Sequence, residues 1–121
     1  MGFSSLPRIR GTQIGLRDPA LVDTIKEAML AGEYAYRETR GMIAGVRDPF
    51  GVYHVIEGHH RMVAALEIFR EHDDDRCVRL LLEHGRWPDI TYVPSDSRPM
   101  PSRYWLGRLQ NRLGFGLGWI R

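Results

Sequence analysis

One short segment constrains the fold of this chain more than any other. Residues 52–57 alternate in the manner of a strand, Gly58 interrupts them, and a helical pattern begins at once. The apolar stripe of that helix consists of Met62, Ala65, Leu66 and Phe69. A strand that passes into a helix within two residues is typical of domains that pack helices against a sheet.

Two elements are predicted before this segment. Asp18 is the predicted N-cap of a helix over residues 19–31, which ends before Gly32. Its predicted core positions are Leu21, Ile25, Ala28 and Met29. A strand over residues 42–47 follows, and the sequence Asp-Pro-Phe-Gly at 48–51 predicts the turn of a hairpin.

The rest of the chain completes a single domain of 121 residues. A helix is predicted over 76–84 with Val78, Leu81 and Leu82 inward, and a short strand over 89–93. Residues 1–11 are predicted to be an irregular arm, with a short extended segment inside 8–16. A last helix is predicted over 102–113, followed by a glycine-rich tail at 114–121. The fold class is therefore α/β (α+β), with a mixed sheet, flanking helices and an extended tail.

Composition excludes several classes of protein. Hydrophobic residues make up 43% and charged residues 26%, as in soluble globular domains. The single cysteine, Cys77, excludes an internal disulfide. No membrane segment and no signal peptide is recognised, which predicts a cytoplasmic chain or one delivered into a target-cell cytoplasm within a larger secreted protein. Lys26 is the only lysine among 17 basic residues, and this arginine bias suits a polyanionic partner.

The junction at residues 58–61 predicts a phosphate-binding site. The first N–H groups of a helix have no partner within the helix, and the helix dipole adds positive charge there. Gly58 allows close approach of a ligand, and Arg61 supplies a forked donor. His59 and His60 can each accept, donate or carry a proton near neutral pH.

Three further residues are candidates for this site. Glu57 precedes the glycine and could act as a base, hold a metal or pair with an arginine as a structural carboxylate. Arg37 and Arg40 precede the hairpin and are candidate phosphate ligands. His54 is interpreted as an ordinary residue of the strand face. The acidic residues at 72–75 are interpreted as the start of a helix in preference to a metal site.

The order helix, hairpin and Gly-His-His-Arg, with Ala64-Ala65 in the next turn, resembles the superfamily of ParB N-terminal domains and sulfiredoxin. In that superfamily a Gly-x-x-Arg box grips nucleotide phosphates. The match covers Gly58, His60 and Arg61, with His59 at the variable position. The resemblance extends over about residues 8–93.

Two departures narrow what the resemblance implies. Sulfiredoxin has its catalytic cysteine where this chain has His59, so sulfinic-acid reduction is disfavoured. The Glu-Asn-x-x-Arg box of chromosome-partitioning ParB is absent, and only residues 95–98, Ser-Asp-Ser-Arg, occupy a comparable place. No helix-turn-helix that reads DNA follows in this chain, which disfavours chromosome partitioning.

The resemblance therefore implies a ParB-like nuclease acting on DNA or RNA, of the kind found as toxin or effector modules of bacterial secreted proteins. His60 or His59 would move a proton, and Arg61 would stabilise charge on the phosphoryl oxygens. Partners would be nucleic acid and, for a toxin, a cognate acidic immunity protein. The alternatives are a CTP- or ATP-binding switch using the same loop and a non-catalytic nucleic-acid-binding module. Whether the nuclease uses Mg²⁺ or no metal stays open, because the sequence has no strong cluster of metal ligands, and the switch would bind a nucleotide.

Overall fold

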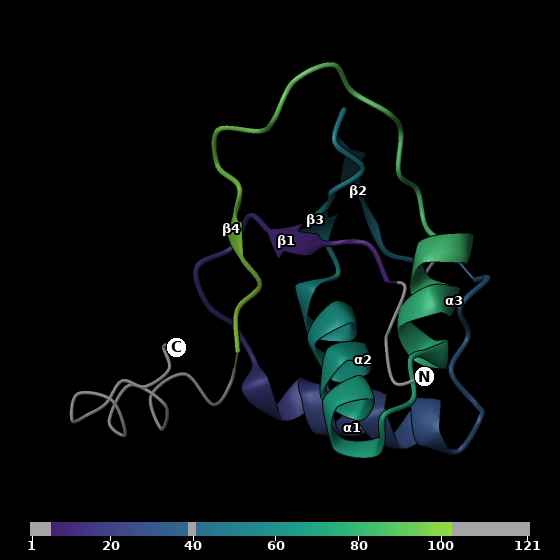
Figure 1. Cartoon of the computed structure of the whole chain (residues 1–121). Helices are drawn as coiled ribbons and strands as arrows, with labels where there is room; N and C mark the ends of the chain where they lie inside the picture. Colours follow the sequence, from purple (N-terminus) through teal and green to yellow (C-terminus); the bar gives the residue numbers. More distant parts are fainter. Residues whose placement is uncertain (1–5, 39–40, 103–121) are drawn as a thin grey trace.

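A computed structural model describes residues 6–38 and 41–102 of the chain. Figure 1 shows three helices and four short strands. In chain order they are β1 (Ile9–Gly11), α1 (Pro19–Leu30), β2 (Ala44–Arg47), β3 (Tyr53–Glu57), α2 (His59–His72), α3 (Arg76–His84) and β4 (Arg98–Pro99). The α+β class with a mixed sheet is as the sequence predicts.

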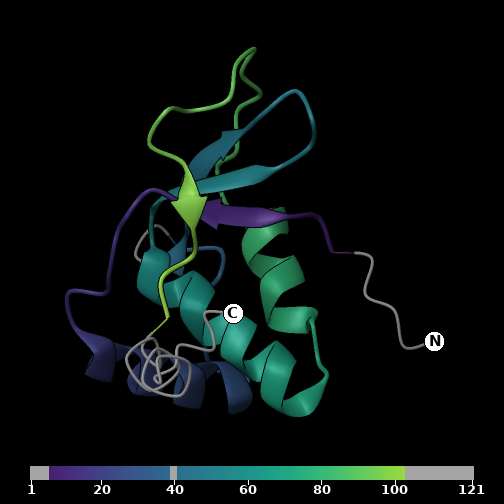
Figure 2. The same ribbon diagram turned by 60° about the vertical axis from the view of Figure 1, so that its left-hand side comes forward.

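The sheet has the strand order β2-β3-β1-β4. Strands β2 and β3 form the predicted antiparallel hairpin, while β1 runs parallel to β3 with Ile9 opposite Tyr53. Strand β4 is antiparallel to β1, with Arg10 opposite Pro99. The first strand of the chain is therefore an interior strand, and Figure 2 shows it beside β4.

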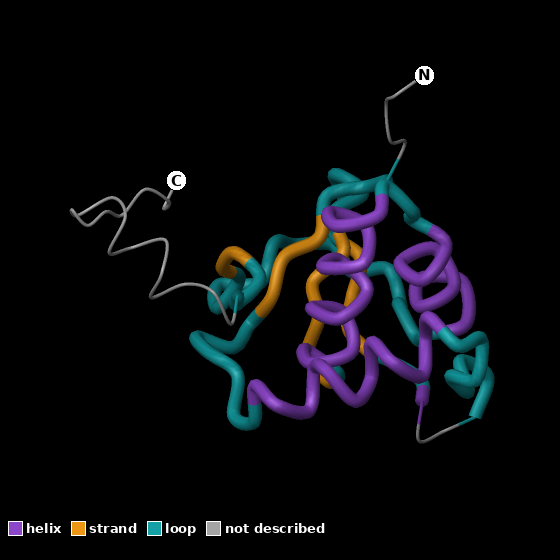
Figure 3. The backbone as a smooth tube through the Cα atoms, turned by 90° about the horizontal axis from the view of Figure 1, so that it is seen from below, coloured by secondary structure: helices purple, strands orange, loops and turns teal. Residues whose placement is uncertain are grey.

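All three helices lie on one side of the sheet, as Figures 1 and 3 show. Helix α2 packs against both α1 and α3. The core between helices and sheet is built mainly from aliphatic side chains of α1, α2, α3 and β3. Its fully buried members include Val22, Ile43, Val55, Met62, Ile68, Val78 and Leu81.

The ends of helix α1 match the sequence prediction, but one of its predicted core residues does not. Pro19 occupies its first turn and Gly32 follows its end with φ 74°. Asp18 occupies the N-cap position, but its side chain makes no capping hydrogen bond. The prediction that Leu21 faces the core is wrong, because Leu21 is 41% exposed and Val22 is fully buried instead.

The hairpin turn at 48–51 is also as predicted. The Gly51 N–H donates to the Asp48 carbonyl oxygen at 3.0 Å, and the Phe50 N–H donates to Asp48 Oδ1 at 2.8 Å. A bulge interrupts the pairing of β2 and β3 between Ala44 and Gly45. The hairpin is therefore closed at one end by an aspartate and distorted at the other.

One sequence prediction about strands is wrong. Residues 89–93 form no strand; instead Arg86 and Asp89 make isolated parallel bridges to Ala44 and Arg47, so the chain after α3 borders β2. The chain begins to pair with β2 at Arg86, which is three residues before the predicted strand. There the Gly45 N–H donates to the Arg86 carbonyl oxygen at 2.9 Å, shortly after the end of α3. Residues 9–11 form β1, which lies within the extended segment predicted over residues 8–16.

The predicted helix at 102–113 and the tail at 114–121 lie outside the described residues, apart from Ser102. Among the residues that are described, no helix has the length and apolar character needed to cross a membrane.

Candidate functional site

The N-terminus of α2 borders a cavity of about 560 Å³. Its walls come from four parts of the chain: the segment between β1 and α1, the first turns of α1, the loop after α1, and the junction of β3 with α2. The residues predicted from sequence that line it are Glu57, Gly58, His59, His60 and Arg61. The fold thus brings most of the predicted site residues around one hollow.

Gly58 sets the direction in which α2 leaves the sheet. Its φ is 100°, in the left-handed region that side chains disfavour. A Cβ at this position would lie 2.8 Å from Cγ1 of Ile43. Both the backbone conformation and the close packing therefore require glycine at the start of α2.

Arg61 lies in the first turn of α2 and is held against the wall of the cavity. Its Nη1 donates to the carbonyl oxygen of Met42 at 3.1 Å. Burial raises the pKa of the nearby Tyr34 hydroxyl, and the positive charge of Arg61 opposes that shift. The guanidinium is thus fixed between the loop before β2 and Tyr34, at the edge of the cavity.

Both histidines of the motif hold the segment that precedes α1. His59 Nε2 accepts a hydrogen bond from the Thr12 N–H, and His60 Nε2 accepts one from the Asp18 N–H, each at 3.0 Å. A ring nitrogen that accepts from a backbone N–H carries no proton, so this geometry assigns the ring proton of each histidine to Nδ1. The two rings therefore hydrogen-bond the segment between β1 and α1 to the start of α2.

His59 is the more buried of the two, with 2% of its surface exposed. Burial, and then the proximity of His60, lower the pKa of His59 below its usual value of 6.5. Its ring also packs within 3.1 Å of where a Cβ of Gly11 would be. A neutral, enclosed His59 is better suited to packing than to proton transfer.

We expect stability to fall as the pH drops below about 6.5, because the unfolded chain then binds a proton that folded His59 resists. One such group changes the free energy of unfolding by at most about 1.4 kcal/mol per pH unit. Urea unfolding at pH 7 and pH 5 measures the change. His59→Gln should flatten this dependence, whereas His72→Gln, at the exposed end of α2, should leave it unaltered. If the free energy of unfolding of His59→Gln depends on pH as it does in the wild type, His59 is not the group responsible.

The cavity also contains an arginine that was not among the residues predicted from the sequence. Arg17 lines it beside Asp18, and the only signal in the sequence was its place directly before the helix start. Glu57 is exposed at the end of β3 and lines the same hollow. Arg37 is exposed and is not one of the lining residues, and Arg40 lies outside the described residues.

The acidic residues near 72–75 have structural partners. Asp74 pairs with Arg76 at 2.8 Å, and Asp75 pairs with Arg79 at 2.9 Å along α3. Within residues 6–38 and 41–102, no group of three His, Cys, Asp or Glu side chains is arranged to hold a metal ion.

Comparisons with known proteins found no matching family model, no matching curated protein and no matching solved structure.

Proposed function

We propose that the cavity at the start of α2 binds the phosphate group of a nucleotide unit. The observation that carries this proposal is that the N-terminus of α2, which has no side-chain cap, lines one hollow together with Arg17 and Arg61. A volume of about 560 Å³ lies within the range of small-ligand sites. The resemblance of Gly58 and Arg61 to the phosphate box of ParB-like domains supports the same ligand.

The reaction we propose is hydrolysis of a phosphodiester in DNA or RNA. The N-terminus of α2 and Arg17 would hold the phosphate, and Arg61 would stabilise charge that develops on its oxygens. The exposed carboxylate of Glu57 is the best placed base for the attacking water, because Nε2 of each histidine is already occupied. His60 would donate to the substrate through Nδ1. Nucleic acid is then the partner, and an immunity protein follows only if the chain is a toxin.

A second candidate is a nucleotide-binding switch that does not cleave nucleic acid. Two observations favour it: both histidines are engaged in holding the backbone, and the wall of the cavity includes Leu21, Ile25 and Tyr34. An apolar and aromatic wall beside a phosphate site suits a base or a ribose. The ligand would be CTP or ATP.

The test is incubation of the purified chain with plasmid DNA and total RNA, with and without Mg²⁺. For a nuclease, Glu57→Gln should reduce cleavage at least about 100-fold, and Arg61→Lys should also reduce it, because lysine cannot reproduce the forked contact. Arg37→Ala removes an exposed arginine that does not line the cavity and is the matched control.

The outcomes separate the two candidates. Cleavage that survives in Glu57→Gln and Arg61→Lys would place the reaction elsewhere. If the wild type cleaves nothing but binds CTP or ATP, and Arg61→Lys weakens that binding, the switch is the correct function. If neither cleavage nor nucleotide binding is detected, the phosphate-site proposal fails.

A further inference from the structure

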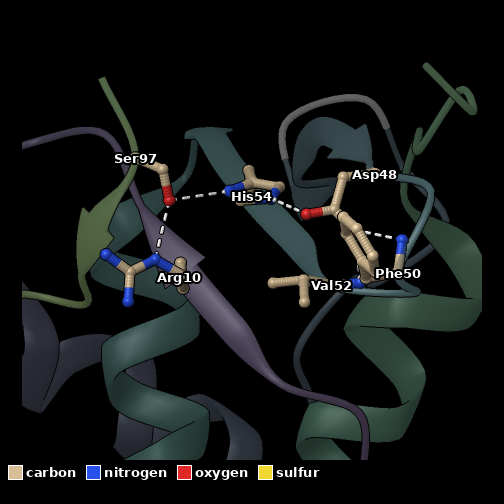
Figure 4. Close-up of polar contacts among 6 residues, drawn as sticks. All are labelled: Arg10, Asp48, Phe50, Val52, His54 and Ser97. Atoms are coloured by element: carbon tan, nitrogen blue, oxygen red, sulfur yellow. Dashed lines mark hydrogen bonds and ion pairs between the residues drawn. The ribbon is translucent and has the colours of Figure 1, made fainter. Parts of the chain in front are cut away.

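A second polar cluster lies on the opposite face of the sheet. Figure 4 shows its four members: Arg10 of β1, Asp48 of the hairpin turn, His54 of β3 and Ser97, directly before β4. His54 points away from the helices because successive strand residues face opposite sides and its neighbour Val55 is in the core. None of the four lines the cavity at the start of α2. This cluster is therefore separate from the phosphate site proposed at the start of α2.

The cluster is a continuous chain of short hydrogen bonds. His54 Nε2 lies 2.8 Å from Asp48 Oδ2, and His54 Nδ1 lies 3.0 Å from Ser97 Oγ. Arg10 Nε donates to the same Ser97 oxygen at 2.7 Å. These contacts join the hairpin, β1 and the segment before β4, which are far apart in the sequence (Figure 4).

The partners determine where the protons lie. Asp48 Oδ1 accepts from the backbone N–H groups of Phe50 and Val52, at 2.8 and 3.1 Å. Burial alone would raise the pKa of the Asp48 carboxyl, but the hydrogen bonds from His54 and these N–H groups hold it below its usual value. An ionised Asp48 can only accept, so His54 Nε2 must carry the proton that is shared with it.

The contacts of Ser97 indicate where its hydroxyl proton lies. In a neutral imidazole that carries its proton on Nε2, Nδ1 is an acceptor and can take the serine proton. Arg10 can only donate, so its bond occupies a lone pair of Ser97 Oγ and leaves the hydroxyl proton for His54 Nδ1. The sequence of groups is thus hydroxyl, imidazole base and orienting carboxylate, which is the arrangement that activates a serine nucleophile.

Ser97, His54 and Asp48 all border one cavity, and Ser97 is the most exposed of the three. His54 and Asp48 are 1% and 5% exposed, whereas Ser97 is only half-buried. A cavity of about 350 Å³ lies above the cluster, and its lining includes Arg8, Arg10, Ser97 and the 81% exposed ring of Phe50. A network with a purely structural role would not need a cavity at its serine.

We propose that Ser97 is the nucleophile of a second reactive centre, with His54 as its base and Asp48 as a positioning residue. The substrate class is a phosphate ester. Arg8, directly before β1, and Arg10 within it both line the cavity, and Arg10 already contacts Ser97, so the cavity offers two cationic side chains to a phosphoryl group. A neutral carboxylic ester would gain less from two cations.

The reaction proceeds in two steps, transfer of the phosphoryl group to Ser97 and hydrolysis of the phosphoserine. Ser97 Oγ forms a bond to phosphorus while the bond between phosphorus and the leaving oxygen breaks, and the hydroxyl proton passes to His54 Nδ1 and then to the leaving oxygen. Water next attacks the phosphoserine, gives a proton to His54, and releases phosphate as the serine oxygen regains a proton. Water is the only co-reactant.

The test uses an organophosphorus fluoride, which transfers its phosphoryl group to an activated serine with loss of fluoride. We expect peptide mass spectrometry of the labelled wild-type chain to place the added mass on Ser97. Ser97→Ala should take no label, and Arg10→Gln should label at least about 10-fold more slowly. Ser95→Ala, in the same segment but exposed, is the control and should label like the wild type.

Three further measurements distinguish a catalytic role of the cluster from a structural one. His54→Asn should label about 100-fold more slowly, and Asp48→Asn should change the pH profile of labelling because the imidazole is no longer held in one tautomer. Hydrolysis of a nitrophenyl phosphate should be lost with Ser97→Ala. A wild-type chain that stays unlabelled, or labels on other serines equally, would overturn the proposal. So would a folded His54→Asn variant that labels at the wild-type rate.

Discussion

Gly45→Ala is expected to destabilise the chain by more than about 3 kcal/mol, a large share of the roughly 5–15 kcal/mol that stabilises an ordinary domain. A Cβ on Gly45 would overlap the carbonyl oxygen of His54 and lie 2.7 Å from Cζ3 of Trp87. The carbonyl belongs to the neighbouring strand and cannot rotate away without disrupting the hairpin. The bulge between Ala44 and Gly45 is therefore possible only because this residue has no side chain.

Urea unfolding followed by circular dichroism measures this loss. Gly15→Ala is the matched control, because a Cβ at Gly15 would meet nothing within 4 Å. The control should alter the free energy of unfolding by less than about 0.5 kcal/mol. Equal stability of the two variants would show that the hairpin can widen at the bulge.

Lys26→Met is expected to lower the free energy of unfolding by about 3 kcal/mol, which is the second large effect. Lys26 Nζ lies 3.0 Å from Oε1 of Glu67, and the two side chains are 12% and 5% exposed. Burial lowers the pKa of Lys26, but its hydrogen bonds to Glu71 and Glu67 outweigh that effect and raise the pKa overall. Removing the ammonium leaves the Glu67 carboxylate buried on α2 without its cation from α1.

The neighbouring carboxylate provides the comparison. Glu71 also pairs with Lys26, at 2.9 Å, but its side chain is 40% exposed, so Glu71→Gln should cost less than about 1 kcal/mol. The double variant Lys26→Met/Glu67→Leu should regain most of the loss, because it removes both charges. Thermal melting of the four chains tests this ranking. A Lys26→Met variant no less stable than Glu71→Gln would contradict it.

The helices were predictable because their signals are local. Pro19 and Gly32 bracket α1, Gly58 precedes α2, and Gly85 follows α3. Each signal acts through the backbone of its own residue, so distant parts of the chain do not override it. The hairpin turn was predictable for the same reason, since Asp48 bonds to N–H groups only two and four residues away.

The roles of individual side chains depend on partners that the sequence does not place. Residues 58–61 mark a helix start, but nothing local shows that His60 will accept from the N–H of Asp18, 42 positions earlier. His54 was read as an ordinary strand residue because its contact with Ser97 spans 43 positions. Periodicity predicts which face a residue occupies and does not identify its neighbours there.

The interior position of β1 has a consequence for how the protein is made. Strand β1 leaves the ribosome well before β4, because its contact with the segment before β4 spans 87 positions, from Arg10 to Ser97. At ordinary rates of translation, the interval is on the order of ten seconds. Until then one edge of β1 has no strand beside it, a state that invites pairing with other nascent chains. Expression yield should therefore depend on chaperones that shield this edge during synthesis.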